Sequence, residues 1–136
     1  DGVERAQFQF SEWEPGDSIT RPMPDGSYPS WDTIRHRYWR ARAQLATDGE
    51  FSPQNMGLMR AGYAPKASVL VRDRDTGKYS IKVVTLEIHH NRGGRGTQGF
   101  DEPIDLREVW PWEHEQLDPS RHPGYDFISF YSVHSK

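Results

Sequence analysis

The chain has 136 residues and contains no cysteine. Disulfide bonds and thiolate metal ligands are therefore excluded, so any metal must be held by histidine, aspartate, glutamate or asparagine. Long hydrophobic runs are missing too, and because no stretch reaches the length of a membrane span we expect no membrane segment. Apolar residues make up only 34% of the chain, whereas aromatic residues reach 12%. These proportions predict one domain whose core depends on aromatic side chains.

Charge is distributed unevenly along the chain, although the net charge is only −3. Residues 1–30 carry six acids against two bases, and residues 98–136 carry eight acids against three bases. Residues 31–97 carry twelve bases against six acids. This surplus could form a surface that faces phosphate groups. A solvated basic face without a partner is the alternative interpretation.

The first 29 residues are rich in proline, glycine and acids, which predicts a loop wrapped on the surface. Only Gln7 to Phe10 alternate as an edge strand would. No methionine precedes Asp1, so we expect the chain to be a fragment of a longer polypeptide.

Two helices are predicted next. Ser30 is a candidate N-cap, and apolar residues follow it at spacings of three and four, which places them on one helix face: Trp31, Ile34, Tyr38, Ala41 and Leu45. A second, short helix is expected to begin at Ser52-Pro53 and to end at Gly62. Met56 and Met59 are its expected core contacts.

A β-hairpin is predicted over residues 67–72 and 79–86, with a turn at 75–78. Its second strand delivers Glu87, His89 and His90 at its end. Alternate side chains of an extended chain share a face, so Glu87 and His89 should point one way and His90 the other. That split suits two roles, a metal ligand and a general base.

Histidine is concentrated in one window, since four of the six histidines lie between residues 89 and 122: His89, His90, His114 and His122. Imidazoles crowded beside carboxylates are what a metal site with a general base requires. The intervening loop, residues 91–99, is basic and rich in glycine, so its backbone could approach a phosphate closely. An ordinary flexible turn is the alternative.

Further secondary structure is expected after this loop. A short strand is predicted over residues 104–109, followed by a helix from Trp112 to Leu117 between two prolines. His114 and Asp118 are four residues apart, which puts them on one helix face. Residues 125–131 should form a final strand, and the fold class predicted is α+β.

The order of strand, E-x-H-H, Gly-Gly loop, short strand and histidine-bearing helix resembles the HNH nucleases of the ββα-metal (His-Me finger) superfamily. The likeness is closest to the toxin branch at the C-termini of bacterial polymorphic toxins, such as Rhs-type effectors. It covers residues 52–122, including the lead-in at 55–65. Residues 1–51 lie outside the resemblance. We expect the single domain to consist of an N-terminal extension and helix (1–51), a nuclease core (52–122) and a C-terminal strand (123–136).

The resemblance implies a role for each matching residue. His89 matches the first metal ligand and His114 the second, while His90 matches the general base that activates water. Glu87 matches an acid that lies beside the metal and orients its neighbours. Asp105 stands where the motif's middle asparagine usually hydrogen-bonds the base, so it should hold the tautomer of His90.

The third metal ligand has two candidates. Asp118 occupies the place of a histidine in colicin-like relatives, and helical geometry favours it, whereas a bend after Pro119 could bring in His122 instead. One divalent ion is implied, and these ligand types suit zinc, nickel, manganese or magnesium. Four arginines could clamp neighbouring phosphates: Arg92, Arg95, Arg107 and Arg121.

The function implied is that of a metal-dependent DNA endonuclease with little sequence specificity. It would be a monomeric toxin domain of an interbacterial effector that acts in the cytoplasm of the target cell, and a cognate immunity protein would protect the producer. Two alternatives remain open at this point. One is a non-catalytic binding module stapled by zinc, and the other is a housekeeping or mobile-element HNH endonuclease.

Overall fold

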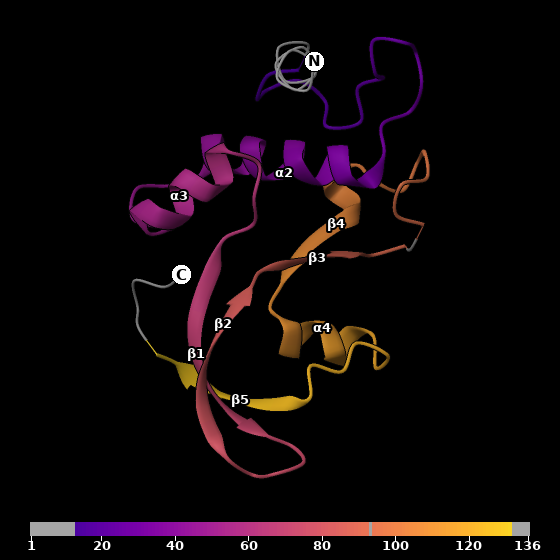
Figure 1. The fold of residues 1–136 in the computed structure, drawn as a ribbon. Helices are drawn as coiled ribbons and strands as arrows, with labels where there is room; N and C mark the ends of the chain where they lie inside the picture. The colour runs from indigo at the N-terminus through magenta and orange to yellow at the C-terminus, as the bar shows by residue number, and fades with distance from the viewer. Residues whose placement is uncertain (1–12, 93, 132–136) are drawn as a thin grey trace, which may run out of the picture.

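A computed structural model describes residues 13–92 and 94–131 and has a mixed α+β architecture, as predicted (Figure 1). The elements in these residues are α2 (Trp31–Leu45), α3 (Pro53–Arg60), β1 (Lys66–Asp73), β2 (Tyr79–Thr85), β3 (Glu87–His90), the 3-10 turn η1 (Pro103–Asp105), β4 (Leu106–Val109), α4 (Pro111–Leu117) and β5 (Tyr125–Phe130). The edge strand predicted at 7–10 lies outside the described residues. None of the described helices combines the length and hydrophobicity that crossing a bilayer requires.

Both predicted helix starts are confirmed by their caps. The Ser30 hydroxyl accepts a hydrogen bond from the Thr33 N–H at 3.2 Å, and the Ser52 hydroxyl accepts one from the Asn55 N–H at 3.1 Å. Each bond satisfies an amide that the first helical turn leaves without a partner. Met59, an expected core contact, is fully buried.

The stripe predicted for α2 is partly wrong. Ile34 is buried as expected, but Leu45 is 76% exposed, whereas Trp39 and Ala43 are buried in the core. The reason is that α2 packs on two sides, with Ile34 in one hydrophobic cluster and Trp39 and Ala43 in another. A single apolar stripe cannot describe a helix with two buried sides.

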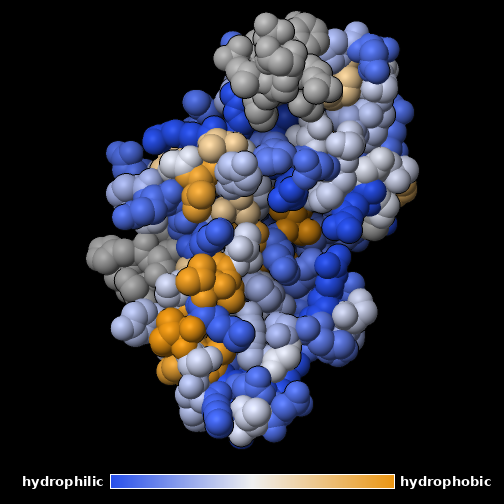
Figure 2. Space-filling model, viewed as in Figure 1, coloured by the Kyte–Doolittle hydropathy of each residue, from blue (hydrophilic) through white to orange (hydrophobic). Residues whose placement is uncertain are grey.

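The predicted hairpin is confirmed and forms part of a three-stranded antiparallel sheet in the order β2-β1-β5. Alternate residues of β1 enter the core, namely Ala67, Val69 and Val71. On the other side of the sheet Ile81 and Val83 remain exposed. Figure 2 shows hydrophobic residues gathered over this sheet, beside hydrophilic surfaces.

The run that leads into E-x-H-H is divided, contrary to the single strand that the sequence predicted. β2 ends at Thr85, and β3 pairs antiparallel with β4 in a separate sheet, with His90 opposite Leu106. The break lies at Leu86, whose side chain is buried and whose N–H donates to the Pro65 carbonyl at 3.0 Å. Helix α4 follows β4 and contacts both strands of the pair (Figure 1).

The N-terminal segment, residues 13–30, has irregular backbone but contributes to a second core cluster. Trp13 and Ile19 are buried there with Ile34 of α2 and Leu106 of β4. Arg37 of α2 is only 4% exposed and donates to the carbonyl oxygens of two segment residues, at 3.1 and 2.7 Å. The described part of the segment is thus a loop on the surface, as predicted, and a few buried side chains anchor it to the core.

Candidate functional site

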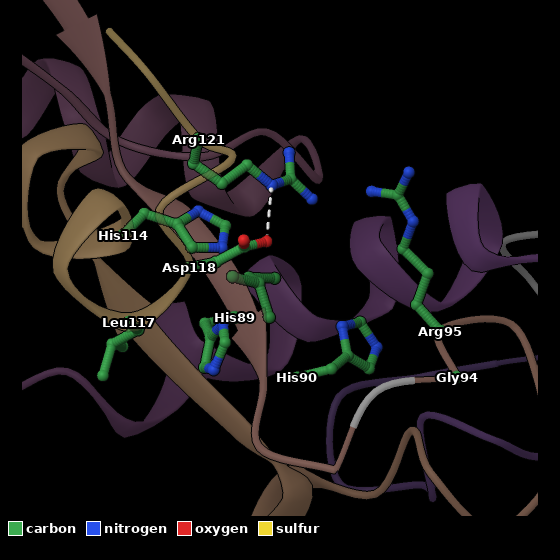
Figure 3. Close-up of a pocket in the computed structure, with 9 residues that line it drawn as sticks. His89, His90, Gly94, Arg95, His114, Leu117, Asp118 and Arg121 are labelled. Carbon is green, nitrogen blue, oxygen red and sulfur yellow. Dashed lines mark ion pairs between the residues drawn. The ribbon is translucent and has the colours of Figure 1, made fainter.

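His89 of β3 and His114 of α4 lie next to each other in the lining of one pocket (Figure 3). Their ring centroids are 5.2 Å apart and the ring planes meet at 81°. Two imidazoles that bind one ion through nitrogens at about 2.0–2.1 Å, at a tetrahedral angle, place their ring centroids about 5 Å apart. The spacing therefore suits a shared cation.

Glu87 supports His114 from the same face of β3. Its Oε1 lies 2.9 Å from His114 Nδ1. An ionised carboxylate can only accept hydrogen bonds, so Nδ1 carries the proton and donates. The lone pair of His114 is then on Nε2, and a carboxylate behind a histidine in this way orients it as a metal ligand.

The surroundings of His89 favour its neutral form. Burial lowers the pKa of His89, and the nearby His114 and His90 act in the same direction. The negative charge of Asp118 acts weakly in the opposite direction. Neutral imidazole is the form that binds a metal ion, because the protonated ring has no free lone pair.

Of the two candidates for a third ligand, the structure brings Asp118 to the pocket wall. Its carboxylate accepts from the Ser120 hydroxyl at 2.7 Å and lies 3.7 Å from Arg121 Nε. The hydrogen bonds from Ser120 lower the pKa of Asp118, so this carboxylate remains ionised. His122 instead pairs with Glu115 at 3.1 Å, with a side chain that is 69% exposed.

The donor set fits an open cation site better than a closed one. In residues 13–92 and 94–131, no group of three or more histidine, aspartate or glutamate side chains is arranged to hold a metal ion. His89 and His114 offer two imidazoles, and Asp118 stands nearby with its carboxylate already bonded to Ser120. Two imidazoles leave most positions of an ion to water or substrate oxygens, whereas a structural zinc site has four protein ligands.

His90 borders the same pocket but is held by different groups. Its Nε2 lies 3.0 Å from Oδ1 of Asp101, and its ring meets the Trp31 ring edge-on with centroids 4.4 Å apart. The His90 side chain is 7% exposed and that of Asp101 is 0% exposed. The two faces predicted for β3 thus have separate partners, Glu87 and His114 on one and Asp101 on the other.

Asp105 does not occupy the position that the resemblance implied. Its carboxylate accepts from Arg92 Nε at 2.9 Å, and its carbonyl oxygen accepts from the Asn91 N–H at 2.8 Å. The expected partner of His90 is therefore corrected from Asp105 to Asp101. Both are acidic residues near the end of the same loop, and only the folded path of the loop distinguishes them.

The four arginines expected to bind phosphate lie in different environments. Arg95 and Arg121 line the pocket (Figure 3). Arg107 is exposed and stands opposite His89 in the β3–β4 pair, so it shares the face of that histidine. Arg92 is bonded to Asp105 and lies over the Phe100 ring, 5.0 Å from its centroid, so it braces the loop.

Helix α2, to which the sequence assigned no chemistry, also reaches the site. Its residues Trp31 and Arg35 line a second cavity, which shares Arg95, His114 and Arg121 with the first. The sequence signal was an arginine one turn after an aromatic residue near the helix start, which is too common to indicate a site.

The site thus has His89 and His114 on one side of β3 and His90, bonded to the buried Asp101, on the other. Arginines lie at its rim. Such a set can hold a cation, accept a proton and bind an anion. Comparison of the chain with protein-family models, with curated proteins and with solved structures found no match.

Proposed function

We propose that this chain is a metal-dependent endonuclease that hydrolyses phosphodiester bonds of DNA with little sequence specificity. One observation carries the proposal: His89 and His114 lie with ring centroids 5.2 Å apart, and the residue next to His89, His90, contacts a buried carboxylate at 3.0 Å. The element order β3, β4, α4, with the helix against both strands, is consistent with a ββα-metal core.

The residues divide the reaction between them. His90 accepts a proton from a water molecule through Nδ1, since its Nε2 is occupied by Asp101. The water oxygen forms a bond to phosphorus, and the bond from phosphorus to the sugar oxygen breaks. A divalent ion held by His89 and His114 would neutralise charge on the phosphate and the leaving oxygen.

Arginines account for substrate binding in this proposal. Arg95 and Arg121 on the pocket wall would neutralise phosphate charge next to the reacting group. Arg107, exposed on the face of His89, would contact an adjacent phosphate. Contacts of this kind position the backbone and read no bases, so low sequence specificity follows.

We further propose that the domain acts as a toxin delivered into a target cell, with a cognate immunity protein as its partner. The support for this step is the E-x-H-H pattern and its surroundings in the sequence. Expression of the wild-type chain in bacteria should then stop growth, whereas His90→Ala should be tolerated. Normal growth with the active wild-type chain would favour a housekeeping or mobile-element enzyme.

The zinc-stapled binding module is disfavoured by the donor set. A structural zinc site needs four ligands, and the described residues bring together two imidazoles, with the nearby Asp118 bonded to Ser120. Chelation by EDTA separates the two functions. The endonuclease should lose cleavage and keep its circular dichroism spectrum, whereas a stapled module should unfold and never cleave.

The direct test is digestion of supercoiled plasmid DNA by the full chain with magnesium, manganese, nickel or zinc added separately. Nicking is expected with at least one cation and should disappear when EDTA is added. His90→Ala serves as the matched inactive control. Intact plasmid with every cation would contradict the proposal, and cleavage of RNA alone would overturn its substrate.

A further inference from the structure

The N-terminal segment reaches the loop that carries the partner of His90. The Tyr28 hydroxyl lies 2.7 Å from Oδ2 of Asp101, and the Thr20 hydroxyl lies 2.5 Å from Oε1 of Glu102. The two acceptors, Asp101 and Glu102, are adjacent in one loop, and both donors come from the N-terminal segment, far away in the sequence. A part of the chain outside the HNH-like stretch thus contacts the candidate base indirectly.

The hydrogen bonds of Asp101 determine which nitrogen of His90 carries the proton. Oδ1 accepts from the Gly96 N–H at 2.9 Å, and Oδ2 accepts from the Tyr28 hydroxyl. Burial and the bond to Asp101 raise the pKa of Tyr28, so the phenol keeps its proton and donates. A carboxylate surrounded by donors remains an acceptor, and the Nε2 atom beside it must therefore carry a proton.

We propose that Tyr28 and Asp101 are positioning residues that hold His90 in the Nε2–H tautomer, with Nδ1 left to accept a proton. Asp101 is 0% exposed, so it acts through His90 and does not touch a substrate. Trp31 packs edge-on against the same ring and limits its rotation. The consequence for cleavage rests on the proposed function, whereas the tautomer can be measured without it.

The tautomer is tested by NMR of the full chain labelled with ¹⁵N at histidine, at a pH where the imidazoles are neutral. The wild-type His90 should show a protonated Nε2 and an unprotonated Nδ1. Asp101→Ala should abolish this preference and lower kcat for plasmid nicking by about tenfold or more. Asp101→Asn keeps an oxygen acceptor for His90 and should retain the tautomer, with a smaller loss of kcat.

Tyr28→Phe and Thr20→Val form a matched pair, because each removes one hydroxyl that binds this loop from the N-terminal segment. Tyr28→Phe should lower kcat several-fold with KM for DNA unchanged, since only the support of Asp101 is lost. Thr20→Val should stay within about twofold of wild type, because its partner Glu102 does not contact His90.

Two results would overturn the proposal. One is an Asp101→Ala variant in which the His90 tautomer and kcat are both unchanged. The other is an equal loss of kcat in Tyr28→Phe and Thr20→Val, which would indicate that both hydroxyl groups only stabilise the loop. If Asp101→Ala does not fold, Asp101→Asn and Tyr28→Phe still decide. A wild-type chain that cleaves nothing would refute the proposed function, while the NMR measurement would still test the tautomer.

Discussion

The two faces of β3 support their histidines with similar bonds in different surroundings. Glu87 and His114 are 2.9 Å apart, and the Glu87 side chain is 41% exposed. Asp101 and His90 are 3.0 Å apart, and the Asp101 side chain is 0% exposed. A hydrogen bond shielded from water is stronger and harder to rearrange. The contact on the His90 side is therefore shielded from water, while the carboxylate on the His89 side remains open to solvent, as the proposed cation site requires.

The two faces also differ in how much of the chain builds them. Glu87, His89 and His114 belong to β3 and α4, which pack directly on each other. Asp101 belongs to the loop between β3 and β4, and its other partner, Tyr28, is 73 residues away in sequence. The proposed cation site is thus built locally, whereas the geometry of the proposed base depends on the N-terminal segment.

Removing the proposed base should have the largest effect. His90→Ala should lower the rate of plasmid cleavage by about 10²- to 10⁴-fold, the usual contribution of a general base. His90→Gln, whose amide can still donate to Asp101, should be as inactive. Cation affinity, measured by isothermal titration calorimetry, should remain close to wild type in both. Cleavage at the wild-type rate by either variant would remove His90 from the mechanism.

The next largest effect is expected on cation binding. His114→Gln removes one of the two imidazoles and should weaken binding by more than about 100-fold, since loss of a group that only supports a ligand already costs about 10–100-fold. Calorimetric titration with nickel or zinc measures this directly, with circular dichroism as the control for folding. Unchanged affinity would show that His114 is no ligand.

Neutralising Glu87 should weaken binding less. In Glu87→Gln the side-chain oxygen can still accept from His114 Nδ1, so only the charge is lost and affinity should fall by about tenfold. Saturating cation should restore cleavage. Asp101→Asn should behave in the opposite way, with reduced cleavage at normal affinity. If the two variants showed the same changes in cation affinity and cleavage, the proposed distinction between the faces of β3 would be wrong.

Acidification should weaken cation binding. Because burial keeps the pKa of His89 below its ordinary value, this ring stays neutral further into acid than a free histidine. Affinity should then hold near neutral pH and fall as the solution is acidified, because protons compete with the cation for the His89 nitrogen. On acidification, His89 is protonated in the unfolded chain before it is protonated in the folded chain. The free energy of unfolding should therefore decrease as the pH falls. Between about pH 8 and pH 5, titration calorimetry tests the predicted fall in cation affinity, and scanning calorimetry tests the predicted fall in stability.

His122→Ala should have the smallest effect. The His122 ring is exposed and pairs with Glu115, which Arg74 also binds at 2.7 Å. Mainly because of Arg74, and less because of His122, the pKa of Glu115 is lowered to about 2. Cation affinity should not change, and the melting temperature should stay close to that of the wild type, because exposed ion pairs contribute little to stability. A large loss of affinity would identify His122, and not Asp118, as the third ligand.

Features set by neighbouring residues were predictable from the sequence. The helix starts at Ser30 and Ser52 depend on hydroxyl groups three residues from the amides they cap. The approach of His89 to His114 followed from the resemblance, since both lie on elements that pack together. The stripe of α2 was not fully predictable, because which of its sides are buried depends on segments that fold against it later in the chain.

The partner of His90 required the folded structure. Asp101 and Asp105 are both acids near the end of the loop, and nothing local distinguishes them. Contacts from Tyr28 and Gly96 bring Asp101 under the ring, and Arg92 engages Asp105. Such long-range hydrogen bonds leave no periodic pattern in the sequence, so motif spacing assigned the wrong carboxylate.

The central claim is that β3 separates cation binding from proton transfer at two adjacent residues. The most direct measurement compares cation affinity and plasmid nicking in His89→Ala and His90→Ala, prepared and assayed side by side. The account predicts that His90→Ala binds the cation normally and does not nick DNA, whereas His89→Ala loses both properties. Normal nicking by His90→Ala, or normal cation binding by His89→Ala, would contradict it.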